Sequence, residues 1–160
     1  QEKNQKRKMN RNNLIQLLNI CLWTARKNNI TLCLELDLGN ELRNCLFNTP
    51  PLILNDVGIT LDTGNYAYYN GDLWDTSWEF SVGRIRHLHI KDRLKTGESC
   101  IIGSGCTNFK TLPEIIKTYR NHGTFTLQGC RSETYNSLEA EVNIVKHQLE
   151  IFKNMTKENK

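Results

Sequence analysis

The chain has 160 residues, of which 38% are hydrophobic and 24% are charged. This composition is that of one ordinary folded domain, and it excludes collagen-like, low-complexity and disordered chains. No run of 18 apolar residues occurs, so we expect no membrane-spanning segment. The formal net charge is +4, and the whole excess lies within residues 1–13, which hold five basic residues and one acidic residue. We interpret 1–13 as a basic, polar lead-in to a helix and, because the remainder is neutral, expect no nucleic-acid partner.

The six cysteines show neither C-x-x-C spacing nor a zinc-finger pattern with histidine. Cys33 lies inside an apolar run, and Cys21 lies on the apolar side of a predicted helix, where a free thiol behaves as a small hydrophobic group. The pattern indicates free thiols and therefore a reducing, cytoplasmic location.

Hydrophobic periodicity predicts helices that alternate with strands along the whole chain. The predicted helices cover 14–25, 41–47, 72–80, 111–122 and 138–152, and the predicted strands cover 30–36, 57–62, 84–90 and 124–128. Thr63 and Gly64 are expected to stop the second strand, residues 91–109 to form a loop, and Thr111 with Glu114 to form a capping box. This order predicts parallel strands joined by helical crossovers in one domain, 14–154, with a polar tail at 155–160.

Each predicted strand has one apolar face and one polar face, because successive side chains of a strand alternate. The apolar positions are Leu34, Leu36, Ile59, Leu61, Leu88, Ile90, Phe125 and Leu127, and the polar ones are Cys33, Glu35, Thr60, Asp62, His87, His89, Thr126 and Gln128. A doubly wound sheet is apolar on both faces. The fold class predicted is therefore α/β, as a partial TIM (β/α) barrel of about four parallel strands with helices on the outer face.

Polar residues that bind metals recur at the C-terminal ends of these strands. Glu35, Asp62 and His89 follow one another at intervals of 27 residues, and Gln128 ends the last strand. We expect the four to lie at one register level, where three oxygen ligands and one nitrogen ligand suit Mn²⁺, Mg²⁺ or Co²⁺, and Zn²⁺ less well. His87 lies one layer deeper and is interpreted as a core histidine. The alternative is that each is an ordinary polar residue at a strand end.

Five phrases in series resemble the xylose-isomerase-like TIM barrels, which comprise sugar and sugar-phosphate isomerases and epimerases together with AP endonucleases. The phrases are LCLELD, GITLDTGN, RHLHIKD, IIGSGCTNF and TFTLQGCR, and the resemblance covers about residues 10–152. It implies that Glu35, Asp62, His89 and Gln128 hold a divalent metal. It also implies that Glu35 acts as the base in proton transfer next to a carbonyl, through an enediolate.

The resemblance implies substrate contacts as well. Lys91 and Arg131, just beyond two strand ends, are expected to contact an anionic or phosphorylated carbohydrate, and the turn 103–105 to bring backbone close to it. Asn65 stands at a substrate-binding position where the family commonly has histidine. Gln128 stands where the family has a glutamate, which removes one negative charge and one candidate base.

The resemblance covers the last four of the family's eight strand–helix units, and a full barrel takes about 250 residues. We therefore expect either that two copies pair or that the chain is the C-terminal part of a longer protein. The function expected is a metal-dependent sugar or sugar-phosphate isomerase or epimerase with a small carbohydrate substrate. The alternatives are a relative of the AP endonucleases, whose additional zinc-binding histidines are missing at Asn65 and after Arg93, and a non-catalytic half-barrel.

Overall fold

The structure is a computed structural model and describes residues 11–35, 57–70, 85–119, 123–130 and 137–157. Its elements are α1 (Arg11–Lys27), β1 (Cys33–Glu35), β2 (Gly58–Asp62), α4 (Thr63–Asn70), β3 (Ile85–Ile90), β4 (Asp92–Arg93), β5 (Ser99–Cys100), η2 (Phe109–Thr111), α5 (Leu112–Tyr119), β6 (Thr124–Leu127) and α6 (Leu138–Thr156). The helices predicted at 41–47 and 72–80 lie outside the described residues.

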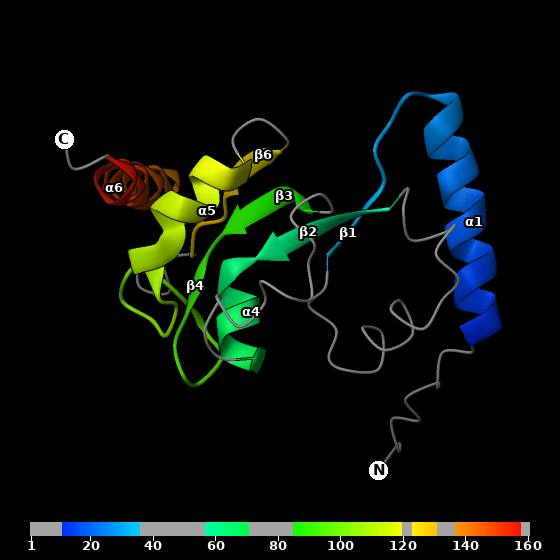
Figure 1. The fold of residues 1–160 in the computed structure, drawn as a ribbon. Helices are drawn as coiled ribbons and strands as arrows, with labels where there is room; N and C mark the ends of the chain where they lie inside the picture. The colour runs from blue at the N-terminus through cyan, green and yellow to red at the C-terminus, as the bar shows by residue number, and fades with distance from the viewer. Residues whose placement is uncertain (1–10, 36–56, 71–84, 120–122, 131–136, 158–160) are drawn as a thin grey trace, which may run out of the picture.

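Four parallel strands form the main sheet, in the order β1-β2-β3-β6. The order of the strands in the sheet is their order in the chain, as in a (β/α) barrel, where each helical crossover places the next strand beside the previous one. Helix α1 stands beyond β1 at one end of the molecule, and α5 with α6 stands at the other (Figure 1). The predicted partial TIM barrel is thus confirmed as an α/β fold in which the four strands of the main sheet are parallel.

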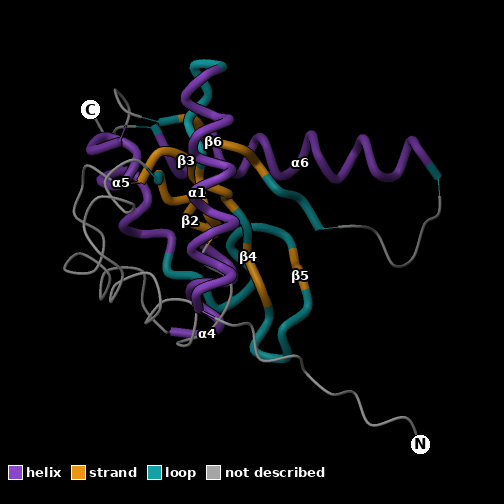
Figure 2. The backbone as a smooth tube through the Cα atoms, turned by 90° about the vertical axis from the view of Figure 1, so that its right-hand side faces the viewer, coloured by secondary structure: helices purple, strands orange, loops and turns teal. Residues whose placement is uncertain are grey.

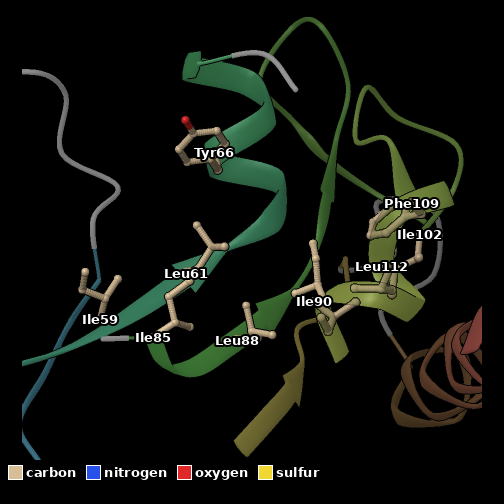
Figure 3. Packing of buried hydrophobic residues seen from close by; sticks show 10 residues of the cluster. Ile59, Leu61, Tyr66, Ile85, Leu88, Ile90, Ile102, Phe109 and Leu112 are labelled. Atoms are coloured by element: carbon tan, nitrogen blue, oxygen red, sulfur yellow. The ribbon is translucent and has the colours of Figure 1, made fainter. Parts of the chain in front are cut away.

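The apolar face of the sheet packs against helices and forms the core. Leu88 and Ile90 are each 1% exposed, and Leu112 at the start of α5 is fully buried against them. Ile59 and Leu61 extend the same layer on β2 (Figure 3). The polar side chains at the alternate positions of each strand point away from this cluster, so they form a second face of the sheet.

The second strand ends before Thr63, as predicted, and a helix follows it directly. Asp62 Oδ1 accepts a hydrogen bond of 2.8 Å from the backbone N of Asn65, which is the bond that an N-cap side chain makes. Helix α4 therefore begins at Thr63, immediately after β2. The Asp-Thr-Gly-Asn phrase does end the strand, but its aspartate also starts the next element.

The segment predicted as a loop at 91–109 contains a short hairpin. Strands β4 and β5 pair antiparallel, with Asp92 opposite Cys100. The helical segment that follows is capped by Asn108, whose side chain accepts from the backbone N of Lys110. The hydroxyl of Thr111 donates to the carbonyl of Asn108, and helix α5 begins at the next residue, Leu112. The capping box of Thr111 with Glu114 stays a prediction.

Helix α1 begins at Arg11 and buries Leu18, Leu22 and Ala25. The chain leaves it through Asn29, at a positive φ of 53°, a conformation that asparagine tolerates at a helix end. Five cysteines within the described residues are free thiols, as expected. No helix in the described part of the chain combines the length and the apolar character that crossing a membrane requires.

Candidate metal centre

Asp62 is the most buried acidic group on the polar face, with 2% of its side chain exposed. Its Oδ1 is engaged by the backbone of α4, which fixes the orientation of the carboxylate. Its other oxygen, Oδ2, is buried and has no hydrogen-bond partner among the described residues. Most buried polar atoms are hydrogen-bonded, so an unpartnered carboxylate oxygen needs an explanation.

His89 supplies a second buried atom without a hydrogen-bond partner, and it faces the first. The residue pairs with Asp62 across β2 and β3, so both side chains leave the sheet at the same level. His89 Nδ1 lies 4.0 Å from Asp62 Oδ2, and no described group makes a hydrogen bond to it. Two buried ligand atoms that point at each other without touching indicate a place for a cation between them.

Glu35, at the end of β1, completes the cluster. Its Oε1 lies 3.4 Å from His89 Nδ1, and 38% of its side chain is exposed. Glu35 pairs with Thr60, not with Asp62, so the prediction of a single register level is wrong. The strands of a barrel are staggered, and the longer glutamate side chain spans the one step that separates it from the aspartate.

The spacing of the three groups fits one divalent ion. Their ligand atoms all lie within 4.8 Å of one another. Two ligands bonded at about 2.1 Å are about 3.0 Å apart at a right angle and about 4.2 Å apart when opposite, so small inward shifts suffice. Two carboxylates and one imidazole suit Mn²⁺, Mg²⁺, Co²⁺ or Zn²⁺ and disfavour soft, thiolate-binding metals.

The electrostatics of the cluster also favour a cation. Burial raises the pKa of Asp62, and the nearby Glu35 carboxylate raises it further, while the hydrogen bond from Asn65 N and the charge of Lys91 lower it. Lys91 Nζ lies 3.9 Å from Asp62 Oδ2 and supplies the nearest fixed positive charge among the described side chains. One ammonium group balances only one of the two carboxylates, so a net negative charge is left at the site.

The position of Lys91 is set by Thr63 at the start of α4. The Thr63 hydroxyl donates to the Lys91 carbonyl at 2.6 Å and accepts from the Lys91 backbone N at 2.9 Å. Gly64 lies so close to this segment that an added Cβ would sit 3.1 Å from the Lys91 carbonyl carbon. Thr63 and Gly64 thus join two strand ends 28 residues apart, a role that the sequence pattern does not reveal.

Asn65 is buried, with 3% exposure, and its side-chain oxygen accepts a hydrogen bond from Arg93 Nε. The Arg93 Nη1 atom in turn donates to the carbonyl of Gly97 in the β4–β5 turn. These contacts give Asn65 a structural connection between α4 and the hairpin. Its expected role in substrate binding stays a prediction.

The Gly-Ser-Gly turn at 103–105 is organised by Asp92, and not by a substrate. Asp92 is fully buried, and its Oδ2 accepts from the backbone N of Gly103 at 2.9 Å and of Gly105 at 2.8 Å. Its Oδ1 accepts from the backbone N of Arg93 and of Thr107. The expectation that this turn uses its backbone on a substrate is therefore wrong for the amides of Gly103 and Gly105.

Gly105 is needed for this arrangement on steric grounds. A Cβ at Gly105 would lie 2.4 Å from Asp92 Oδ1, closer than real Cβ atoms approach another heavy atom. The signal available in the sequence was a pair of glycines 11 and 13 residues after an aspartate, a spacing that here belongs to a carboxylate binding a loop.

Two further predicted residues, His87 and Gln128, lie on or directly after strands of the main sheet. Both ring nitrogens of His87 face hydroxyls, those of Thr124 and Thr126. Gln128 follows β6, where its backbone N donates to the Ile90 carbonyl at 3.0 Å, one step beyond the level of His89. Its role as a fourth ligand stays a prediction, and Arg131 lies outside the described residues.

Comparison with known proteins agrees with this geometry. A family model described as the xylose isomerase-like TIM barrel matches residues 1–155. No curated protein matches the chain. The matched region contains every element described above, from the first helix to nearly the end of α6, and the parallel strands carry their ionisable groups at the C-terminal ends, where such barrels build their sites. The chain therefore belongs to the xylose isomerase-like TIM barrel family.

Proposed function

We propose that the chain acts as a metal-dependent isomerase or epimerase of a sugar or sugar phosphate. The observation that carries the proposal is a pair of facing, buried atoms without hydrogen-bond partners, Asp62 Oδ2 and His89 Nδ1, with the Glu35 carboxylate beside them. Such a cluster costs stability unless a cation is bound, so its presence at the strand ends favours function over packing.

When bound, a divalent ion held by Glu35, Asp62 and His89 supplies Lewis acidity to the carbonyl and hydroxyl oxygens of the substrate. The protein residues perform the proton transfer. Glu35 is the most exposed of the three, so its carboxylate is the group assigned to take the proton from the carbon beside the carbonyl. Returning that proton to the neighbouring carbon, while the proton of the adjacent substrate hydroxyl moves to the former carbonyl oxygen, converts an aldose into a ketose, and no other reactant is consumed.

We assign to Lys91 the stabilisation of the negative charge that develops on the substrate. Its ammonium group lies beside Asp62, with 11% of the side chain exposed, and Thr63 fixes its backbone. A largely buried cation stabilises an oxyanion or a phosphate more strongly than a solvated one, because little water screens it. This placement supports an anionic transition state or a phosphorylated substrate.

Metal binding is the first test. Titration of the metal-free chain with Mn²⁺ or Co²⁺ in a calorimeter should give one site, and Glu35→Ala should weaken the affinity at least roughly tenfold. Glu139→Gln, an exposed acidic residue on α6, serves as the control and should leave the affinity unchanged. Equal affinity of the Glu35→Ala variant and the native chain would refute the assignment of the site.

Proton transfer is the second test. Nuclear magnetic resonance in D₂O with aldose and ketose phosphates should show metal-dependent exchange of the proton beside the carbonyl, and Glu35→Gln should abolish it. Exchange that survives this substitution would remove Glu35 from the role of base. Salt-dependent binding to a duplex with an abasic site, without sugar turnover, would instead favour a relative of the AP endonucleases.

A further inference from the structure

His89 can bind a metal only if its ring keeps Nδ1 turned toward Asp62 and Glu35, as it is in the structure. Histidines that bind metals usually donate their second ring N–H to a neighbouring group, and that bond fixes both the ring and its tautomer. No described residue makes a hydrogen bond to either ring nitrogen of His89. Among the described residues, the orientation of this ring therefore depends on packing.

The ring of His87 is the aromatic neighbour of His89. Both residues lie on β3, two positions apart, so their side chains leave the same face of the strand. The ring centroids are 5.0 Å apart, and the ring planes meet at 90°. Aromatic rings favour this edge-to-face arrangement over stacking face to face. Because the contact has a preferred angle, an immobile His87 ring restricts the rotation of the His89 ring.

His87 is itself held at both ring nitrogens by the neighbouring strand. Strands β3 and β6 lie side by side (Figure 2), with His87 opposite Thr124 and His89 opposite Thr126. His87 Nδ1 shares a hydrogen bond with the Thr124 hydroxyl, and the Thr126 hydroxyl lies 3.0 Å from His87 Nε2. A neutral imidazole has one donor and one acceptor nitrogen, and a hydroxyl can fill either role, so both bonds can form together. They fix the plane of the His87 ring.

The place of His87 in the sheet connects it to the metal ligands and not to the hydrophobic core. The core cluster takes Leu88 and Ile90 from β3, and both belong to the opposite face of the sheet. His87 lies on the polar face, two residues before His89, and is half-buried. The packing of apolar groups therefore does not explain why two hydroxyls hold its ring.

We propose that His87 is a positioning residue for the metal ligand His89. The hydroxyls of Thr124 and Thr126 fix the His87 ring, and this ring holds the His89 ring with Nδ1 turned toward the carboxylates. The proposal rests on the metal site of the proposed function and adds a residue that does not itself bind the ion. A ligand held in its binding orientation strengthens metal binding, because less rotational freedom is lost when the ion binds.

Calorimetric titration with Mn²⁺ measures the effect of His87 on the site. His87→Ala should weaken the affinity about tenfold. Thr126→Val, which removes one of the two hydroxyls from an exposed position, should weaken it about threefold, and Thr126→Ser should restore the native value. Both substitutions act through one ring, so adding Thr126→Val to His87→Ala should weaken binding no further. Thr96→Val removes an exposed hydroxyl of the hairpin and should leave the affinity unchanged.

The orientation of the His89 ring in the metal-free chain gives a second measurement, which does not require metal binding. Nuclear magnetic resonance of labelled histidine should show one His89 rotamer in the native chain and exchange among several in His87→Ala. Thr126→Val, at its exposed position, serves the same comparison if His87→Ala does not fold, and should show increased exchange.

Three results would overturn the proposal. The first is a single His89 rotamer in the folded His87→Ala variant. The second is a native chain that binds Mn²⁺ no more tightly than His87→Ala and Thr126→Val do, and the third is a further loss of affinity in the double variant. A native chain that binds no Mn²⁺ would instead overturn the proposed function, and the rotamers of His89 would still decide whether His87 orients it.

Discussion

Asp62→Asn is expected to stabilise the metal-free chain while removing its response to a divalent cation. The carboxylate is 2% exposed, and one of its oxygens has no described hydrogen-bond partner. Asparagine keeps an oxygen in the place of Oδ1, so the hydrogen bond from the backbone N of Asn65 survives. The substitution therefore removes a buried charge and retains the helix cap.

The size of the effect follows from Asp62 Oδ2, which is buried without a hydrogen-bond partner among the described residues. An unsatisfied buried polar group costs about 1–3 kcal/mol, and more when it is charged. The loss of the attraction to Lys91, 3.9 Å away, offsets part of the gain. We expect a net stabilisation of about 1–2 kcal/mol, which raises the midpoint of thermal unfolding by about 2–8 °C in a domain of this size.

The effect depends on pH with a defined sign. The pKa of Asp62 is raised in the folded chain above its ordinary value of 3.8, so the folded state binds the proton more tightly than the unfolded state. Below pH 3.8 the native chain keeps all the stability that the protonated Asp62 side chain provides, and it loses that stability as the pH rises through the raised pKa of Asp62. The advantage of Asp62→Asn should therefore be absent in acid and complete at neutral pH.

Thermal unfolding in a chelator, at a series of pH values and then with Mn²⁺, measures both effects. At about 100 times its dissociation constant the ion should stabilise the native chain by about 2.7 kcal/mol and the variant by much less. Glu35→Gln is the matched control, because that carboxylate is exposed: it should lose the metal response without gaining metal-free stability. A variant less stable than the native chain at neutral pH, or one with the full metal response, would refute the reasoning.

Three further substitutions test how the fold supports the site, each by urea denaturation. Gly105→Ala places a Cβ 2.4 Å from Asp92 Oδ1 and should cost about 2–4 kcal/mol, whereas Ser104→Ala, on the exposed neighbour, should change the stability by less than about 0.5 kcal/mol. Asp92→Ala leaves four backbone N–H groups without their acceptor and should cost about 3–5 kcal/mol, so a stable variant would contradict the assigned role. Leu88→Ala, at a core position 1% exposed, should cost about 2–5 kcal/mol, and an unchanged denaturation midpoint would show that the core is elsewhere.

The cluster of Glu35, Asp62 and His89 was predictable because side chains alternate between the two faces of a strand. A strand places every second side chain on the same face, so the parity of Glu35, Asp62 and His89 could be read from the sequence, and the structure brings these three together. Their relative heights could not be read in this way. The stagger between β1 and β2 places Glu35 beside Thr60 and not beside Asp62. This stagger is a property of the paired sheet and not of either strand.

The contacts around the cluster were not predictable for a different reason. The sequence predicted only a stop at Thr63 and a loop after Lys91, since the partners lie far along the chain. The hydrogen bonds between Thr63 and Lys91 join residues 28 apart, and Asp92 reaches Thr107 across 15 positions. Each of these contacts exists only after the strands have paired.

The alternation of residues along each strand is enough to show which side chains share a face, which face is apolar, and that three strand ends carry groups able to bind a metal, because these properties repeat with the local geometry of a strand. Only the packing of the strands and helices shows that Asp62 caps a helix while it faces His89, and that the glycine turn binds Asp92. These features depend on contacts between elements that are distant in the chain, and no pattern of neighbouring residues encodes such contacts.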